Sequence, residues 1–138
     1  MEMNYLALIV CAIVALIIGM LWYGKALFGN MWMKITGMDT MTVDAQAEAK
    51  KGMAKMVAVQ LVLSFVSAFV LSRFINMSGM SGVTMAFWIW LGFLMPTSGG
   101  SALWSGKPKG LAWSMFFITA GAELVTFLAY GFILDMWK

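Results

Sequence analysis

The sequence predicts an all-α, polytopic integral membrane protein, and composition, hydropathy and charge spacing all indicate it. The 138 residues are 62% hydrophobic and 11% charged, whereas a soluble domain is about 45–50% apolar and about 25% charged. The mean hydropathy is +0.88. A soluble protein of this size could not bury so much apolar surface, so we expect the chain to lie in lipid.

Four intervals between the charged residues are long and apolar enough to form transmembrane helices. A helix needs about 20 mostly apolar residues to cross about 30 Å of hydrocarbon, and it satisfies its own backbone groups there. The spacing predicts spans over residues 4–23, 54–74, 82–104 and 110–132, in one four-helix domain over residues 1–138. Before the first span stands Glu2 with no basic residue, and no A-x-A site follows the span. We therefore expect an uncleaved helix rather than a signal peptide.

The only sizeable polar region, residues 25–53, is expected to be an amphipathic cytoplasmic loop. Gly37 divides it into two parts, and Thr42 is placed to cap a helix in the second part. Glu48 and Lys51 are spaced i,i+3, which predicts an ion pair on the surface of this helix. The helix is expected to continue directly into the second span.

The distribution of Lys and Arg predicts the orientation of the chain. With four spans, the first and third loops face the same side of the membrane, and that side holds seven basic residues: Lys25, Lys34, Lys50, Lys51, Lys55, Lys107 and Lys109. The other side holds two, Arg73 and Lys138. Because cytoplasmic loops carry the excess of basic residues, we expect both termini outside, in a bacterial-type inner membrane.

Aromatic residues gather at the predicted cytoplasmic ends of the spans: Trp22, Tyr23, Phe28, Trp32, Trp104 and Trp113. They could anchor the helices at the membrane interface, or they could bind a ligand. Anchoring is the favoured interpretation, because amphipathic rings prefer the depth of the lipid headgroups.

Small residues recur every four positions on the first span, at Ala7, Cys11, Ala15 and Gly19. Such stripes let helix backbones approach closely, which matters where lipid provides no hydrophobic drive between helices. The stripe predicts tight packing, although Ala and Gly are also frequent in this chain. The partner helix could belong to the same chain or to a second copy.

Glu123 is the most informative single residue, because it lies within the fourth predicted span. It is 14 residues from Lys109, or about 21 Å along a helix. A carboxylate facing lipid there costs about 2.5–3.5 kcal/mol. We therefore expect it to face protein or water, or to be protonated. Thr119, Glu123, Thr126 and Tyr130 share one helix face through their i, i+4, i+7, i+11 spacing.

Other spans offer polar partners for this face. The second span carries Gln60, Ser64 and Ser67, and the third carries Thr97 and Ser98 directly after Pro96. Pro96 also frees a backbone carbonyl near Gly92, which needs a partner in lipid. Ser64, Thr97 and Thr119 are expected at one depth, with Glu123 beyond them. Two interpretations remain open: a polar cavity or proton-linked site, and interhelical hydrogen bonds worth about 0.6 kcal/mol each.

Several function classes are disfavoured by what the sequence lacks. With no His and a single Cys, Cys11, imidazole metal sites and internal disulfides are excluded. We find no nucleophile–base constellation and no phosphate-binding loop, so we expect a non-catalytic protein without a metal or cofactor. The basic residues flank the spans and set topology, so no nucleic-acid partner is expected.

Several motifs resemble those of a small bacterial membrane family catalogued as domain of unknown function 1761. The opening element is Gly19-x-x-Trp22-Tyr23-Gly24, followed by Phe28-Gly29 and Trp32. Later elements are Lys50-Lys51-Gly52-Met53, Gly92-Phe93-Leu94-Met95-Pro96-Thr97 and the stretch from Gly121 to Gly131. The Trp-Tyr-Gly and Pro-Thr elements are the most specific. The resemblance implies a four-helix membrane protein over nearly the whole chain, and it implies no established activity or catalytic residue.

Two functional classes follow from this pattern. One is a small-molecule or ion permeation or carrier module, with Glu123 as its titrating group and a homo-oligomer as its assembly, since four short helices enclose little space. The other is a non-catalytic structural or accessory subunit of a larger membrane complex, which would dock through the small-residue stripes. The lipid bilayer is a partner in both, and the sequence identifies no ligand.

Overall fold

The computed structural model describes residues 3–24 and 27–137, and the described chain is helical without any β-strand. The elements in order are α1 (Tyr5–Trp22), α2 (Gly29–Thr36), the 3₁₀ turn η1 (Met38–Thr40), α3 (Val43–Lys51), α4 (Met53–Ser78), α5 (Gly82–Ile89), the π-helical η2 (Trp90–Leu94), α6 (Met95–Leu103) and α7 (Lys109–Met136). The all-α prediction is confirmed. Among the described residues, α1, α4 and α7 are long and apolar enough to cross a membrane.

The region predicted as the third span, residues 82–104, is not one regular α-helix. Helical residues continue from α5 through η2 into α6, and the Met95 N–H bonds the Trp90 carbonyl five residues back. Pro96 explains the departure. A proline lacks an N–H and its ring collides with the carbonyl four residues earlier in an α-helix. A π turn contains one extra residue, so the proline ring no longer faces the carbonyl four residues earlier as it would in a regular α-helix.

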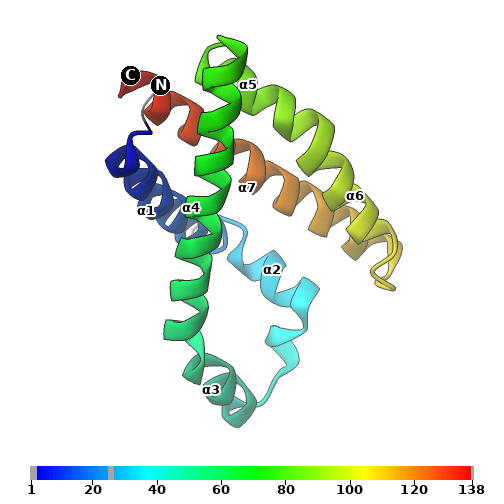
Figure 1. Ribbon diagram of the computed structural model, residues 1–138. Coiled ribbons are helices and arrows are strands. Elements are labelled where there is room, and N and C mark those ends of the chain that lie inside the picture. The colour runs from blue at the N-terminus through cyan, green and yellow to red at the C-terminus, as the bar shows by residue number, and fades with distance from the viewer. Residues whose placement is uncertain (1–2, 25–26, 138) are drawn as a thin grey trace.

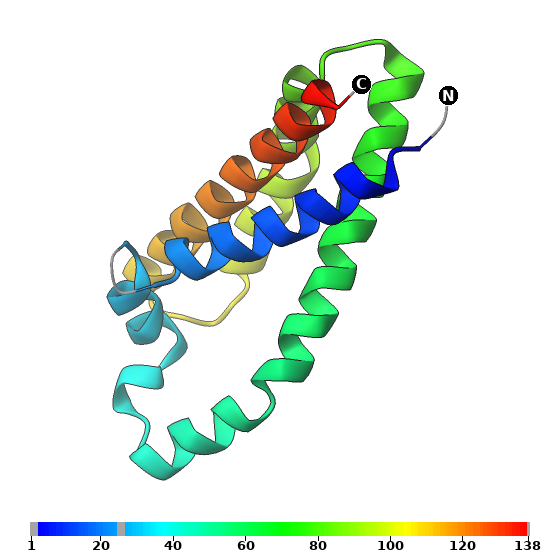
Figure 2. The same cartoon turned by 90° about the vertical axis from the view of Figure 1, so that its left-hand side faces the viewer.

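Helix α7 occupies the centre of the fold, where it packs against α1, α5, α6 and α2, while α4 packs mainly against α1 and α5. Successive long helices run in opposite directions, so both ends of the described chain lie together at one end of the molecule (Figure 1). The Asn4 side-chain amide donates to the Trp137 carbonyl oxygen at 3.2 Å. Figure 2 shows α1 and α7 side by side, while the first half of α4 leaves the bundle towards α3.

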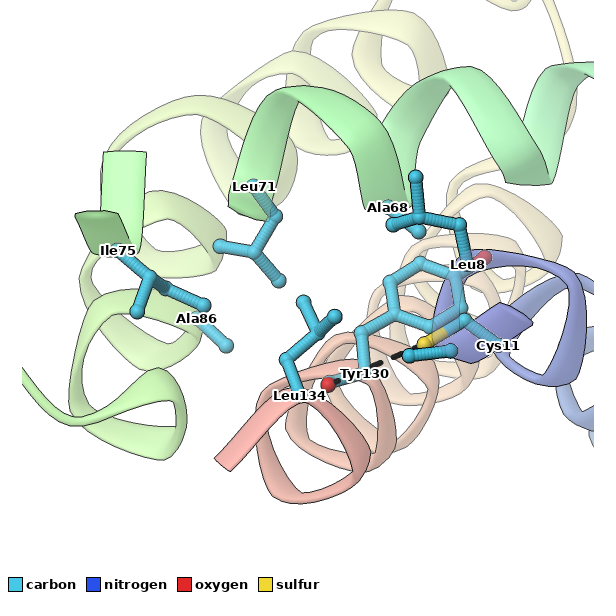
Figure 3. Packing of buried hydrophobic residues seen from close by; sticks show 9 residues of the cluster. Leu8, Cys11, Ala68, Leu71, Ile75, Ala86, Tyr130 and Leu134 are labelled. Atoms are coloured by element: carbon cyan, nitrogen blue, oxygen red, sulfur yellow. Dashed lines mark hydrogen bonds between the residues drawn. The ribbon is translucent and has the colours of Figure 1, made fainter. Parts of the chain in front are cut away.

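The buried core lies where α1, α4, α5 and α7 meet (Figure 3). On α4 the buried residues are Ser64, Ala68, Leu71 and Ile75, a face with i, i+4, i+7, i+11 spacing. On α1, Ala7 and Cys11 are fully buried and Ala15 packs at the edge of the core. At Gly19 an added Cβ would meet no atom within 4 Å. The stripe therefore packs closely only over its first part, because α1 and α4 diverge after it (Figure 2).

The closest helix crossing joins α5 to α7 at Gly82 and Gly131. A Cβ added to either glycine would collide with the backbone of the other. One turn along α7, the Asp135 carboxylate accepts the Gly82 N–H at 2.7 Å and the Val83 N–H at 3.4 Å. Ser81 caps the same helix by accepting the Thr84 N–H. The crossing therefore combines backbone contact with a carboxylate at a helix N-terminus, where negative charge is favoured.

Residues 27–52 contain short helices, as the amphipathic pattern predicts. Thr42 Oγ1 accepts the Ala45 N–H at 3.1 Å, and the exposed Glu48–Lys51 pair closes at 3.0 Å. Gly37 has φ 80° and ends α2, which is the left-handed conformation that glycine adopts most easily. The predicted continuation of α3 into the second span is interrupted at Gly52, which stands between α3 and α4. Of the residues used to predict topology, Lys25 and Lys138 lie outside the described residues.

Replacing Gly82 or Gly131 with Ala should destabilise the protein, because the added methyl has no room between the two backbones. Overpacking of this kind costs about 1–3 kcal/mol. Thermal unfolding in detergent, followed by circular dichroism, measures the loss. Gly100→Ala is the matched control, since a Cβ there meets no atom within 4 Å and Ala is the better helix former by about 1 kcal/mol. Equal stability of Gly82→Ala and Gly100→Ala would contradict the close crossing.

Candidate functional site

The polar residues of α7 meet different neighbours along the helix. Glu123 stands near its middle, about halfway between Lys109 and Met136, and its side chain is half-buried. Thr119 lies one turn before it, towards the end of α1, and Tyr130 lies two turns after it, in the core. Thr126 is half-buried between them. The residues that share this face therefore meet different neighbours: Thr119 lies near the end of α1, Glu123 lies near the middle of α7, and Tyr130 lies in the core.

The Glu123 carboxylate is bonded to one side chain of α6. Ser98 Oγ lies 2.9 Å from both Oε1 and Oε2. A hydroxyl carries a single proton, so Ser98 donates to one carboxylate oxygen at a time. In the described chain the only ion pair joins Lys51 to Glu48, so Glu123 has no cationic partner there. A serine hydroxyl is therefore the main polar neighbour of this carboxylate.

Two further hydroxyl-bearing residues lie beside this pair. The Tyr23 side chain, at the end of α1, is close to Thr119 and within electrostatic range of Glu123. Thr119 Oγ1 is buried and makes no hydrogen bond of good geometry in the described chain. Since an unpaired buried hydroxyl is costly, this oxygen marks a place where a further donor or acceptor is favoured. We define the Glu123 site as Glu123, Ser98, Thr119 and Tyr23.

Two tryptophans bond the α7 backbone just before Glu123, on either side of Thr119. Trp22 Nε1 donates to the Ile118 carbonyl at 2.9 Å, and Trp90 Nε1 donates to the Ala120 carbonyl at 2.8 Å. The Trp22 ring also fills the space over Gly121, where a Cβ would approach the ring to 2.9 Å. Trp22 therefore connects α1 to α7, and its anchoring at the membrane interface stays a prediction. No sequence signal could have identified the two acceptor carbonyls, because every residue has one.

A tight turn after α1 brings Tyr23 to the site. The Phe28 N–H bonds the Trp22 carbonyl at 3.0 Å, and the Gly29 N–H bonds the Gly24 carbonyl at 2.8 Å. Gly29 packs so closely on the Gly24 backbone that a Cβ would collide with it. The rings of Tyr23 and Trp32 pack at a centroid distance of 4.7 Å, and those of Trp22 and Phe28 at 5.0 Å. The opening motif therefore builds a compact turn and holds α2 close to α1.

The polar residues of α4 form a second group, apart from Glu123. Gln60 Nε2 donates to Ser64 Oγ at 3.2 Å, and the buried Ser64 interacts with the Tyr130 hydroxyl. Cys11 Sγ lies 4.0 Å from the Tyr130 carbonyl oxygen. Ser64 is thus a partner of Tyr130 in the core, and the single layer expected from Ser64, Thr97 and Thr119 is replaced by two groups.

The remaining predicted residues lie outside both groups. Thr97 is exposed on α6, and Ser67 lines an apolar groove of about 570 Å³ between α4, α5 and α7. Depth along separate helices could not assign these partners, because one residue turns a helix face by about 100°. Thr97 and Ser98 consequently point in different directions. In the described chain no cluster of three Cys, Asp or Glu side chains could hold a metal ion.

The family comparison agrees with the motifs that build this turn and site. A family model described as "Protein of unknown function (DUF1761)" matches residues 6–135, nearly the whole chain. The chain belongs to this family. No curated protein and no solved structure matches it. In this DUF1761 protein, the signature residues Trp22 and Tyr23 contact α7. Gly24 and Gly29 bond each other in the turn between α1 and α2.

A double-mutant cycle should measure the coupling between Ser98 and Glu123. Ser98→Ala, Glu123→Ala and the double variant are compared by reversible unfolding in detergent, because each single substitution removes the hydrogen bond. Interhelical hydrogen bonds in membranes average about 0.6 kcal/mol and reach about 1.7 kcal/mol, so we expect a coupling energy in that range. Thr97→Ala is the matched control, because Thr97 is exposed on the same helix. A coupling energy of zero for Ser98 and Glu123 would contradict the contact between them.

Proposed function

We propose that this protein is a four-span, non-catalytic membrane protein that carries protons, alone or coupled to a small ligand, through the Glu123 site. The observation that carries the proposal is a carboxylate in the middle of an apolar helix, bonded to Ser98 of a neighbouring helix and unpaired with any cation in the described chain. The ligand class includes ions and small molecules whose movement can be linked to one titrating carboxyl group.

The continuity of α5, η2 and α6 supports a fourth span. Together they provide 22 consecutive helical residues, 82–103, or about 33 Å at the rise of an α-helix, which matches the hydrocarbon thickness. The described ends of the chain lie together at one end of the molecule (Figure 1), as an even number of crossings requires. The excess of Lys at the opposite end supports a cytoplasmic loop there and termini outside.

Reporter fusions test this topology. We expect fusions after Met77 and after Lys138 to report an outside location and a fusion near Asp44 to report the cytoplasm, because the basic loops remain inside. A paired alkaline phosphatase and fluorescent protein series makes the measurement. Opposite locations for the Met77 and Lys138 fusions would refute an even number of crossings, and an inverted or mixed pattern would refute the orientation.

The chemistry of Ser98 supports a site that changes protonation state. A hydroxyl can donate to an ionised carboxylate and can accept from a carboxylic acid. Ser98 therefore remains a hydrogen-bond partner of Glu123 in both states, whereas a lysine or arginine partner would stabilise only the ionised form. The Thr119 hydroxyl, buried without a partner of good geometry, adds a second position that a water or ligand atom could use.

Glu123→Gln should abolish proton movement while leaving expression and assembly unchanged, because the amide keeps a hydrogen bond to Ser98 but cannot titrate. The measurement is the internal pH of proteoliposomes containing a trapped pH-sensitive dye, after an imposed proton gradient. Infrared difference spectra across the same pH range should lose one carboxyl band in the variant. Glu48→Gln, on the exposed surface of α3, is the matched control and should behave like the parent.

A docking role is the second candidate, and it rests on α4. The first described buried residue of this 26-residue helix is Ser64, and its exposed apolar residues before that point include Met53, Met56 and Val59. This half could contact a second copy or another membrane subunit. Equal proton flux in parent and Glu123→Gln liposomes, together with a stoichiometric partner in mild detergent, would replace the carrier proposal with this one.

A further inference from the structure

A cavity between α6 and α7 lies at the end of the molecule opposite to the two termini. Its volume is about 500 Å³, within the range of about 300–1,000 Å³ that is typical of small-molecule sites. The walls are apolar, from Met95, Pro96, Trp113 and Phe116, and two lysines, Lys107 and Lys109, line it as well. None of the four residues of the Glu123 site lines this cavity.

The two lysines bring positive charge to an otherwise apolar cavity. Lys107 Nζ donates one hydrogen bond to the Ile35 carbonyl at 3.0 Å, which holds the side chain between α2 and the cavity. An ammonium group has three donors, so further donors are available to a ligand. Lys109 is exposed, and neither lysine has a carboxylate partner in the described chain. The cavity therefore combines apolar walls with uncompensated positive charge.

The surroundings match the boundary between hydrocarbon and headgroups. Trp104 is 87% exposed and Trp113 is 54% exposed, and such rings prefer the membrane interface. Helix α7 also begins here, after Pro108 and without a capping side chain, so its first amides add partial positive charge beside the lysines. A ligand of this cavity would place its apolar part among Met95 and Phe116 and its charged part at the interface.

We propose that this cavity binds an anionic phospholipid, with an acyl chain between α6 and α7 and the phosphate on Lys107 and Lys109. The observations that carry the proposal are the shape and charge of the cavity: the apolar walls complement the chain, and the lysines complement the headgroup. The proposal rests on the membrane location in the proposed function and is independent of proton transport by Glu123. Each basic residue near an anionic membrane surface contributes about a fivefold change in affinity.

Native mass spectrometry of the full-length protein in detergent tests the proposal. The probes are dioleoyl phosphatidylglycerol and dioleoyl phosphatidylcholine, which share acyl chains and differ in headgroup charge. We expect tighter binding of phosphatidylglycerol by the parent. Lys109→Gln should weaken that binding about fivefold, and the Lys107→Gln, Lys109→Gln double variant about 25-fold. Lys55→Gln makes the same charge change at an exposed residue of α4 outside the cavity and should leave binding unchanged.

A second variant separates the apolar part of the site from its charge. Ala112→Leu enlarges a side chain that lines the cavity, and it should weaken phosphatidylglycerol binding without changing net charge. The exposed Lys109 side chain makes no hydrogen bond or ion pair in the described part of the chain, so its replacement should not unfold the protein; a thermal unfolding scan checks this. Equal binding of both lipids, unchanged binding by Lys109→Gln, or displacement of the lipid by inorganic phosphate alone would overturn the proposal. If the parent binds phosphatidylglycerol as expected but shows no proton flux that depends on Glu123, the carrier proposal is contradicted and the lipid proposal stands.

Discussion

The fold depends on contacts that neighbouring helices make with the backbone of α7. Two of its carbonyls, at Ile118 and Ala120, accept indole N–H groups from α1 and η2. Farther along, Gly131 meets Gly82 backbone to backbone, and Asp135 bonds the first amides of α5. In lipid, apolar side chains gain little free energy by exchanging contacts with lipid tails for contacts with one another. Close packing and polar contacts therefore determine which helix faces meet. Helix α7 concentrates both kinds of contact.

These contacts also explain why Glu123 can occupy an apolar helix. The two indole bonds lie just before it on α7, and they bring α1 and the helix containing η2 and α6 against the same segment. The turn after α1 places Tyr23 near Glu123, and α6 places Ser98 against it. The carboxylate thereby has the Ser98 hydroxyl as a hydrogen-bond partner and the Tyr23 side chain nearby, which lowers the cost of keeping a polar group within an apolar helix.

Local patterns predicted local structure well. Thr42 caps α3, Glu48 pairs with Lys51, and Gly37 ends α2, because each effect involves residues within about one helical turn. The same reasoning identified Ser64 and Ser98 as inward-facing candidates but could not assign their partners. Ser64 meets Tyr130, and Ser98 meets Glu123. Pairing them requires the crossing angles and relative depths of the helices, which no single-helix pattern contains.

The sequence by itself determined that the chain is helical and apolar, where its long helices lie, and that Glu123 shares a face with Thr119 and Tyr130. Hydropathy and the periodicity of the α-helix are properties of neighbouring residues, so they can be read along the chain. Only the tertiary structure decided that Trp22 bonds a carbonyl 96 positions away and that the polar residues divide into two groups. These outcomes depend on how closely particular small residues let two backbones approach, and that distance is set jointly by helices far apart in sequence.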